Sequence, residues 1–157
     1  MAYGTGIGWR VYIGPTTPAA TESAYAALAW VEIGGVESVP EFGGESAVVT
    51  FTTLADGTVQ KLKGSTDYGT VSLTVARDPL DPGQIAAAAA AATKFAYAIK
   101  IAADDGADAN DTDSVFYSHA LVTSARVNPG GAGDPSRRPI GLAFTKPFIE
   151  KPSTAVA

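Results

Sequence analysis

The sequence predicts a mainly β protein: an antiparallel β-sandwich or partly closed barrel with one flanking α-helix and an extended β-hairpin arm. Three observations lead to this prediction. Residues 69–77 and 94–101 each alternate apolar and polar side chains, which is the pattern of a half-buried strand. Between them, residues 81–93 combine helix-start signals with a run of alanines. Residues 46–64 place an Asp-Gly pair between two strand-like runs, which predicts the arm.

Composition limits the class of protein. With 157 residues and 46% hydrophobic content, the chain is expected to form a single domain over residues 1–157. The net charge of -5 argues against a general affinity for nucleic-acid backbones or anionic membranes. The absence of cysteine excludes disulfides and thiolate metal sites. The start MAYGTGIGWR carries no secretion signal and the alanine run is too short to span a membrane, so we expect a cytoplasmic origin and no membrane anchoring.

The N-terminal third predicts two short strands. Residues 9–13 read as the first, ended by Gly-Pro, and residues 30–33 as the second, ended by Gly-Gly. Between them, a helical turn is expected around residues 25–28. The segment VESVPEFGGES that follows is expected to be irregular, because its proline and paired glycines interrupt regular structure.

The arm is predicted as a hairpin in which Asp56 and Gly57 are the two loop residues of a tight primed turn. That register places Leu54 opposite Val59. It also sets Thr52 opposite Lys61 and Phe51 opposite Leu62. The expected faces are Val49, Phe51 and Leu62 on one side and Thr50, Thr52, Lys61 and Lys63 on the other, with an apolar tip at Leu54 and Val59. Because a two-stranded ribbon with apolar residues on both faces is only marginally stable alone, the arm is expected to need a neighbour.

The central unit is a strand, a helix and a strand. In residues 69–77 the apolar side carries Val71, Leu73 and Val75, and the polar side carries Thr70, Ser72 and Thr74. Residues 81–93 predict a helix with Asp81 at the N-cap, Pro82 at the first helical position and Gln84 closing a capping box. The alanines give high helix propensity with little bulk, so the helix can lie close against a sheet.

The rest of the chain predicts further strands separated by loops. Residues 94–101 alternate as a second strand, with Phe95, Tyr97, Ile99 and Ile101 on one face. Residues 114–127 and 139–148 are strand-like, residues 104–113 are an acidic solvated loop, and residues 128–138 are a glycine-rich break. Residues 151–157 are expected to be a flexible tail.

No residue pattern predicts catalysis, a cofactor or a metal site. The single histidine, His119, lies inside an alternating strand, where a structural or surface imidazole is expected rather than a catalytic one. The acidic loop offers carboxylates at Asp104, Asp105 and Asp113, together with Asp108, Asn110 and Asp111. It does not follow the calcium-loop order, since the central glycine and closing glutamate are missing. We therefore expect a protein that is not an enzyme.

The order of these elements resembles the tail tube protein, or major tail protein, of long-tailed bacteriophages, the family that includes the major tail protein of phage lambda. The segment SLTVARDPLDPGQIAAAAAAATKFAYAIKI, residues 72–101, carries the resemblance most clearly, and VFYSHALVTSARV resembles the strand that follows. The resemblance extends over residues 30–148. The loops 104–113 and 128–138 look longer than those of the lambda protein.

The resemblance implies a structural virion protein that self-assembles into stacked hexameric rings, forming the tail tube through which DNA is delivered. It implies a virion-tail location with assembly in the bacterial host cytoplasm. Implied partners are other copies of the chain and the tail tip, tape-measure and tail-terminator proteins. DNA would pass without specific binding, because an acidic lumen lets it slide.

The resemblance also implies roles for particular residues. The arm residues expected at subunit contacts are Val49, Phe51, Leu54, Asp56, Gly57, Val59 and Leu62. The small polar side of residues 69–77, namely Thr70, Ser72 and Thr74, is expected to face the lumen.

Two other functions stay open from the sequence. A monomeric β-sandwich that binds carbohydrate or decorates a surface would show exposed aromatic side chains gathered on one face, and Trp9, Trp30 and Tyr68 are candidates scattered in sequence. A hydrolase would require turnover that depends on His119.

Overall fold

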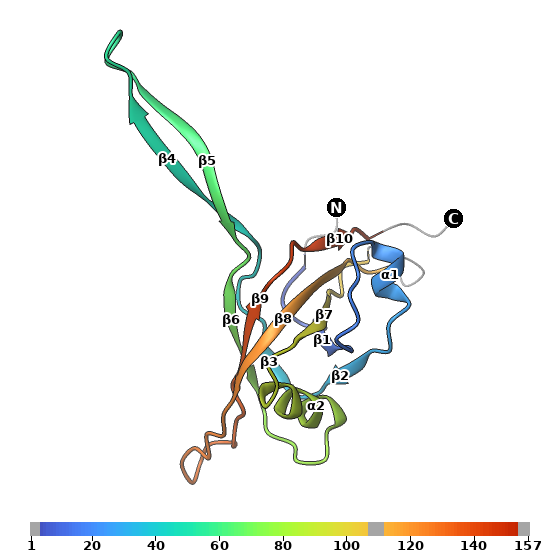
Figure 1. Ribbon diagram of the computed structural model, residues 1–157. Coiled ribbons are helices and arrows are strands. Elements are labelled where there is room, and N and C mark those ends of the chain that lie inside the picture. Colours follow the sequence, from blue (N-terminus) through green and yellow to red (C-terminus); the bar gives the residue numbers. More distant parts are fainter. Residues whose placement is uncertain (1–3, 107–111, 154–157) are drawn as a thin grey trace.

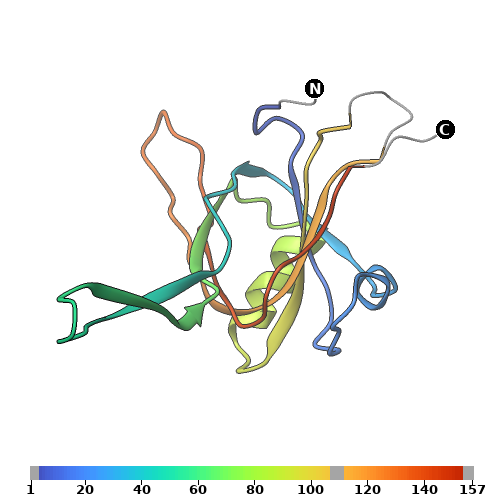
Figure 2. The same ribbon diagram turned by 90° about the horizontal axis from the view of Figure 1, so that it is seen from above.

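A computed structural model describes residues 4–106 and 112–153, and it shows a curled antiparallel sheet, a separate hairpin and two short helices (Figures 1 and 2). The strands are β1 (Arg10–Ile13), β2 (Val31–Ile33), β3 (Val36–Ser38), β4 (Glu45–Thr52), β5 (Val59–Asp67), β6 (Thr70–Val75), β7 (Ala96–Ala102), β8 (Val115–Ala125), β9 (Ile140–Phe144) and β10 (Ile149–Lys151); the helices are α1 (Glu22–Ala26) and α2 (Pro82–Ala91). Neither helix of this described part has the length and apolar character needed to cross a membrane.

The large sheet is a partly closed barrel. Its strands lie in the order β2-β1-β7-β8-β9-β6-β3, and β10 pairs with the long strand β8. β2 and β3 lie at opposite ends of this order, yet only Gly34 and Gly35 separate them in the chain. Because so short a turn joins the two ends, the sheet must curl on itself. Gly35 makes the turn possible at φ +75°, a backbone conformation that favours glycine. The predicted mainly β, partly closed architecture is confirmed.

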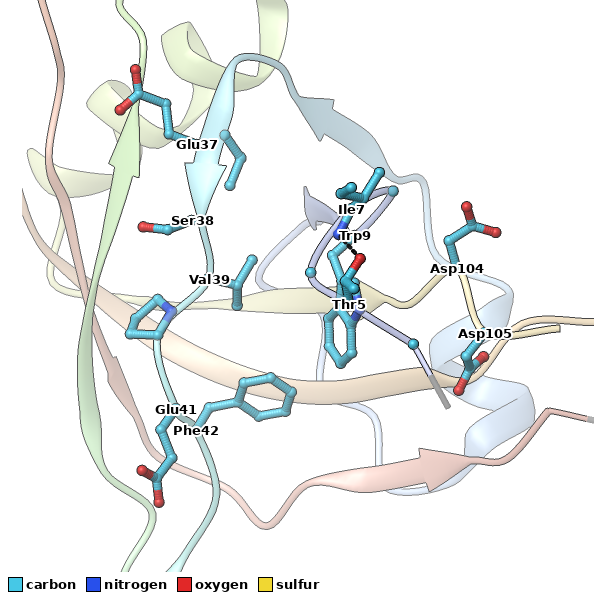
Figure 3. A pocket seen from close by; sticks show the side chains of 15 residues that line it. Thr5, Ile7, Trp9, Glu37, Ser38, Val39, Glu41, Phe42, Asp104 and Asp105 are labelled. Atoms are coloured by element: carbon cyan, nitrogen blue, oxygen red, sulfur yellow. Dashed lines mark hydrogen bonds between the residues drawn. The ribbon is translucent and has the colours of Figure 1, made fainter. Parts of the chain in front are cut away.

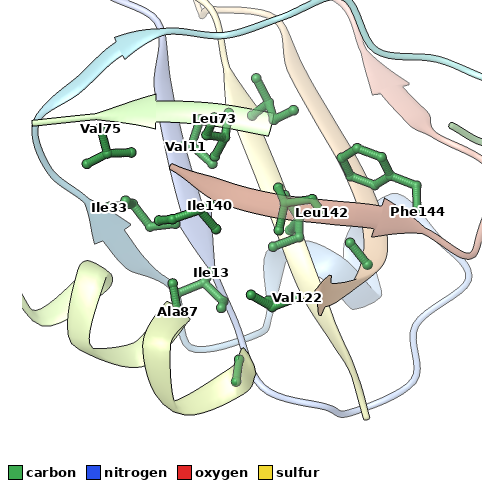
Figure 4. Close-up of a cluster of buried hydrophobic side chains, with 14 residues drawn as sticks. Val11, Ile13, Ile33, Leu73, Val75, Ala87, Val122, Ile140, Leu142 and Phe144 are labelled. Atoms are coloured by element: carbon green, nitrogen blue, oxygen red, sulfur yellow. The ribbon is translucent and has the colours of Figure 1, made fainter. Parts of the chain in front are cut away.

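The hydrophobic core fills the inner face of the curled sheet (Figure 4). Leu73 and Val75 of β6 are fully buried there, whereas Thr70 and Ser72 on the same strand are exposed, so the predicted faces of this strand are confirmed. On β7, Ile99 and Ile101 are buried as well. Burying such a side chain stabilises a fold by about 1.5–3 kcal/mol, so this inner face supplies most of the stability of the body.

α2 closes one end of the barrel. The Asp81 side chain accepts a hydrogen bond from the Gln84 backbone N–H at 2.9 Å, which confirms the N-cap. The predicted capping box is wrong, because the Gln84 amide turns inward: its Oε1 accepts from the Asp78 N–H at 3.0 Å, and its Nε2 donates to the carbonyls of Gly34 and Ala76. This side chain therefore joins α2 to the turn between β2 and β3 and to the segment that follows β6.

The helix lies very close to the sheet, as its small residues predict. A Cβ added to Gly83 would come within 2.1 Å of the Glu32 carbonyl oxygen, so only glycine allows β2 to pass at this point. Ala87 and Ala90 are fully buried one and two turns further on. The low bulk of this helix is thus a packing requirement.

Several boundaries differ from the sequence prediction. Phe95 lies outside β7 and is 55% exposed, because the strand begins only at Ala96. The segment expected to be irregular contains β3. The expected tail begins inside β10, where Lys151 pairs with Val115, and the Ser153 N–H donates to the Ser114 hydroxyl at 3.1 Å. Residues 154–157 lie outside the described residues.

Candidate assembly surfaces

The hairpin of β4 and β5, which we call the arm, extends away from the curled sheet (Figures 1 and 2). Its two strands pair only with each other among the described residues. Thr52 lies opposite Val59 and Phe51 opposite Gln60, so the predicted register is wrong by two residues. A shift of two leaves every side chain on its predicted face, because strand faces alternate with a period of two.

The register differs because the loop is longer than a two-residue turn. Thr53 and Thr58 close it through a backbone hydrogen bond of 3.3 Å, leaving four residues, Leu54 to Gly57, in the loop. Gly57 adopts φ +65°. Asp56 holds the loop by accepting hydrogen bonds from the Thr53 hydroxyl and the Thr58 N–H. These bonds, chiefly the one from Thr53, lower the pKa of the Asp56 carboxyl, so it stays ionised near neutral pH.

The arm is unusually rich in exposed apolar side chains. Twelve large hydrophobic residues are exposed in the described part of the chain, and half of them lie on this one hairpin. They are Val48, Val49, Phe51, Leu54, Val59 and Leu62. Exposed apolar groups of this density mark surfaces that bind other molecules.

The arm has two distinct faces. The first, which we call the apolar face, joins Val49 directly to Leu62 across the ribbon, with Phe51 next along the strand. The second, which we call the lysine face, carries Val48, Thr50, Thr52, Val59, Lys61 and Lys63. The structure thus brings three of the expected interface residues together on the apolar face, sets Val59 on the other, and puts Leu54, Asp56 and Gly57 in the loop. Val48 was not among the expected interface residues. Its position two residues before Thr50 could have placed it on the lysine face, because alternate strand residues share a face.

A short connection holds the arm to the body. β5 ends at Asp67 and β6 begins at Thr70, so one nearly continuous run of chain belongs first to the arm and then to the sheet (Figure 1). Gly69 makes the junction at φ +93°: its N–H donates to the Asp67 carboxylate, and its carbonyl accepts from the Phe144 N–H at 2.9 Å. The direction of the arm is therefore fixed by a strand of the core.

The second surface is the outer face of β6 and its neighbours. Thr70 and Ser72 are exposed there and Thr74 is half-buried. Ser72 lies opposite Gly141 on β9. A Cβ on Gly141 would come within 2.6 Å of the Thr123 hydroxyl, so the side chains of β8 cover this glycine. The three residues expected at the lumen thus share a face of small, uncharged side chains.

The residues considered for other functions have structural roles. His119 is buried; its Nδ1 lies 2.8 Å from the Tyr25 hydroxyl and its Nε2 lies 2.9 Å from the Thr17 carbonyl oxygen. The carbonyl can only accept, so Nε2 carries the proton and Nδ1 accepts from Tyr25. Burial is the main cause that lowers the His119 pKa. Through these two hydrogen bonds, the His119 imidazole on β8 holds α1 and the segment before it against the sheet.

The aromatic side chains and loop carboxylates weighed for other functions take different roles in residues 4–106 and 112–153. Trp30 donates its indole N–H to the Tyr25 carbonyl at 3.0 Å, and Trp9 stacks on Phe116 with ring centroids 6.1 Å apart, so both indoles serve packing. No group of three or more His, Asp or Glu side chains within this part could hold a metal ion. Asp108, Asn110 and Asp111 of the acidic loop lie outside it.

Comparison with known families identifies the architecture. The family model for phage tail tube proteins matches residues 15–128, which is well over half of the chain. The chain belongs to the phage tail tube protein family. Members of this family form the tube of the phage tail, so this chain is a structural, non-enzymatic component of the virion tail. No curated protein matches the sequence.

Two solved structures show the same fold. One is a chain of the sheath/tube terminator of an extracellular contractile injection system, PVC, with 15% identity, a TM-score of 0.66 and coverage of 95% of this chain and 97% of that chain. The other is the tail tube of phage SPP1, with 14% identity, a TM-score of 0.61 and coverage of 92% and 76%. Because the chain belongs to the tail tube family, the carbohydrate-binding and hydrolase functions that the sequence left open are set aside.

Proposed function

We propose that copies of this chain assemble into hexameric rings, which stack into a hollow tube, and that the arm makes essential contacts between copies. The observation that carries this proposal is the hairpin without a packing partner in the described part of its own chain, bearing half of the exposed large apolar side chains. Burial at about 25 cal/mol per Å² makes such side chains a strong source of association free energy.

Deleting residues 46–64 and closing the gap with a short glycine linker tests the role of the arm. Negative-stain electron microscopy of the unaltered protein should show hollow tubes or rings of uniform diameter. The deletion variant should stay monomeric in size-exclusion chromatography and melt close to the unaltered monomer, because the core lies in the body.

A point variant sharpens the same test. Phe51→Ser combined with Leu62→Ser removes the apolar face, and assembly should fall strongly. The control Ser65→Ala changes an exposed residue of the same strand without removing apolar surface, and it should assemble normally. Tubes from the deletion variant that match the unaltered ones would refute the role of the arm.

We further propose that Thr70, Ser72 and Thr74 face the lumen, where DNA passes without specific binding. The support is chemical: the outer face of β6 carries small uncharged groups, and the chain as a whole is acidic. A surface without cations does not hold the phosphate backbone, since protein cations supply nearly all non-specific affinity for DNA.

Replacing Ser72 with lysine tests the lumen assignment. Six copies per ring would place a ring of positive charge along the path of the DNA, and delivery from assembled particles should slow. The control Ala20→Lys adds the same charge at an exposed site outside β6. Equal delivery by both variants would move the lumen to another face.

The tube proposal implies partners at its two ends. The fold similarity to a chain of a sheath/tube terminator structure supports contact with a tail-terminator protein. We propose the tail tip and tape-measure proteins as the further partners, at the other end of the tube and inside it. Co-purification of these proteins with tubes from infected host cells would test each contact.

A further inference from the structure

The curled sheet leaves a groove where it does not close. The groove lies between residues 4–9, the chain from β3 to Phe42, and the pair Asp104–Asp105, and it encloses about 940 Å³ (Figure 3). β3 pairs with β6 on one side only, so its other edge borders the groove. A space of this size is at the upper end of ligand cavities, which run to about 1,000 Å³, and can accept several side chains at once.

The floor of the groove is apolar. Trp9, Val39 and Phe42 are partly buried and pack on the hydrophobic core. Trp9 and Phe42 meet edge to face, with ring centroids 6.3 Å apart. Their exposed portions form a rigid apolar surface, because both rings are held from below by the core.

The rim of the groove is acidic. Four carboxylates line it, those of Glu37, Glu41, Asp104 and Asp105, and the lining contains no lysine or arginine. Glu37 is already engaged by Arg137 at 2.8 Å. Asp105 accepts hydrogen bonds from the Ser114 hydroxyl and N–H, which lower its pKa and keep it ionised.

Two of these carboxylates are available to a partner. Glu41 and Asp104 are exposed, and no cation of the described residues lies within ion-pair distance of either. Arg10 lies near enough to Asp104 for the two charges to interact, without forming an ion pair with it. The groove therefore combines an apolar floor with a net negative rim. Such a combination selects a partner that carries apolar side chains beside cations.

The lysine face of the arm has this combination. Val48 on β4 and Val59 on β5 are exposed apolar groups of this face. Lys61 and Lys63 follow Val59 on β5. The two lysines are about 7 Å apart along the strand, because alternate strand residues are separated by two rises. The six residues of the lysine face include no carboxylate.

We propose that the groove of one copy receives the lysine face of the arm of a second copy. In this contact Lys61 and Lys63 lie toward Glu41 and Asp104, and the two valines lie over Trp9 and Phe42. The arm must come from another copy, because it leads away from its own body in both views (Figures 1 and 2). The inference rests on the proposed role of the arm in assembly and names the surface that the arm binds.

Thiol cross-linking can test this contact cleanly, because the chain contains no cysteine. Lys63→Cys and Glu41→Cys are purified separately, mixed under assembly conditions and treated with a short bismaleimide. A covalent dimer should form in the mixture and be nearly absent when either variant is treated alone. Lys94→Cys replaces an exposed lysine outside the arm, and its mixture with Glu41→Cys should give only the background level.

Charge reversal gives an independent measurement. Lys61→Glu with Lys63→Glu should raise the critical concentration for assembly about tenfold or more, and Glu41→Lys with Asp104→Lys should do the same, since like charges then face each other. Carrying all four changes in one chain should restore assembly to within about threefold of the unaltered protein. The control pair Lys94→Glu and Glu150→Lys reverses exposed charges outside both surfaces and should leave the critical concentration unchanged.

The outcomes separate this proposal from the proposed function. Tubes that form without the mixed cross-link, or reversed charges that are not rescued by combination, overturn the groove contact and leave tube assembly standing. An unaltered protein that stays monomeric at every concentration overturns both. The mixed cross-link together with rescue establishes the groove as the surface that binds the arm.

Discussion

The arm and the body use the same residue types for different purposes. Leu62 in the arm is 57% exposed, whereas Leu73 in the body is fully buried, although both occupy strands that alternate in the same way. In the body, the apolar side of each strand meets another part of the same chain. In the arm, β4 and β5 pair only with each other among the described strands, and their large apolar side chains stay exposed. Apolar side chains of the body therefore stabilise the monomer, and those of the arm are available for assembly.

The most sensitive test of this contrast is a matched pair of leucine substitutions. Leu73→Ala should lower the free energy of unfolding by about 3 kcal/mol, because it leaves a cavity in a packed core. Leu62→Ala should change that free energy by less than about 0.5 kcal/mol, as exposed substitutions generally do. Urea denaturation below the assembly concentration measures both. Similar losses from the two variants would mean that the arm packs on its own body.

A second substitution probes how the body is fastened at α2. The Gln84 side chain makes three hydrogen bonds with backbone groups of Gly34, Ala76 and Asp78. Gln84→Met keeps the shape and leaves those groups without their partner, so the free energy of unfolding should fall by about 2 kcal/mol. Assembly of the folded fraction should be unaffected, since the arm is remote from α2. A stable Gln84→Met variant that no longer assembles would contradict this separation.

A smaller effect is expected from pH, and it belongs to the body alone. The buried His119 has a lowered pKa in the folded chain, so between that value and the unfolded value near 6.5 the unfolded chain binds more protons. The contribution of the buried His119 to the free energy of unfolding is therefore fully present above about pH 6.5 and is lost as the pH drops below it. The groups that face the ring are Tyr25, the Thr17 carbonyl and Lys146; the hydrogen bond to Thr17 opposes the lowering of the pKa, and the positive charge of Lys146 adds to it.

The variant His119→Gln isolates this effect. Unfolding free energies of both proteins between pH 7.5 and pH 5 share the contribution of all other groups, so their difference reports His119. The unaltered protein should lose more stability on acidification than the variant. Parallel curves would show that the imidazole titrates alike in the folded and unfolded chains.

Much of the fold could be predicted because alternation and helix signals are local. The face of β6 that holds Leu73, the cap at Asp81 and the low bulk of α2 all follow from neighbouring residues. β3 was missed because its three residues, Val36–Ser38, pair through β6, which lies more than thirty residues later in the chain. The inward turn of Gln84 was missed for the same reason: its partners include Gly34, which sequence spacing does not bring near.

The same distinction between local patterns and contacts distant in sequence applies to the candidate surfaces. Alternation predicted the two arm faces correctly even though the turn type was wrong, because the error in register was an even number. The groove could not be predicted, since residues 4–9, Phe42 and Asp104 meet only when the sheet curls. Local pattern identifies the side of a strand, and only the tertiary fold identifies what that side contacts.

The smallest expected effect tests whether the arm is independent of the body. Gly57 has φ +65° with open space around its Cβ position, so Gly57→Ala should cost about 1 kcal/mol in the loop through backbone strain alone. Gly133 also has open space and no positive φ, so Gly133→Ala serves as a matched control without strain.

Hydrogen exchange should accelerate at the amides of residues 53 and 57 in the first variant only, because these amides close the arm loop. Amides of β8 should exchange at unchanged rates in both variants, since the arm and the curled sheet are separate hydrogen-bonded units. Faster exchange in β8 of the Gly57→Ala variant would instead show that arm and body open together, and the arm would then contribute to the stability of the monomer.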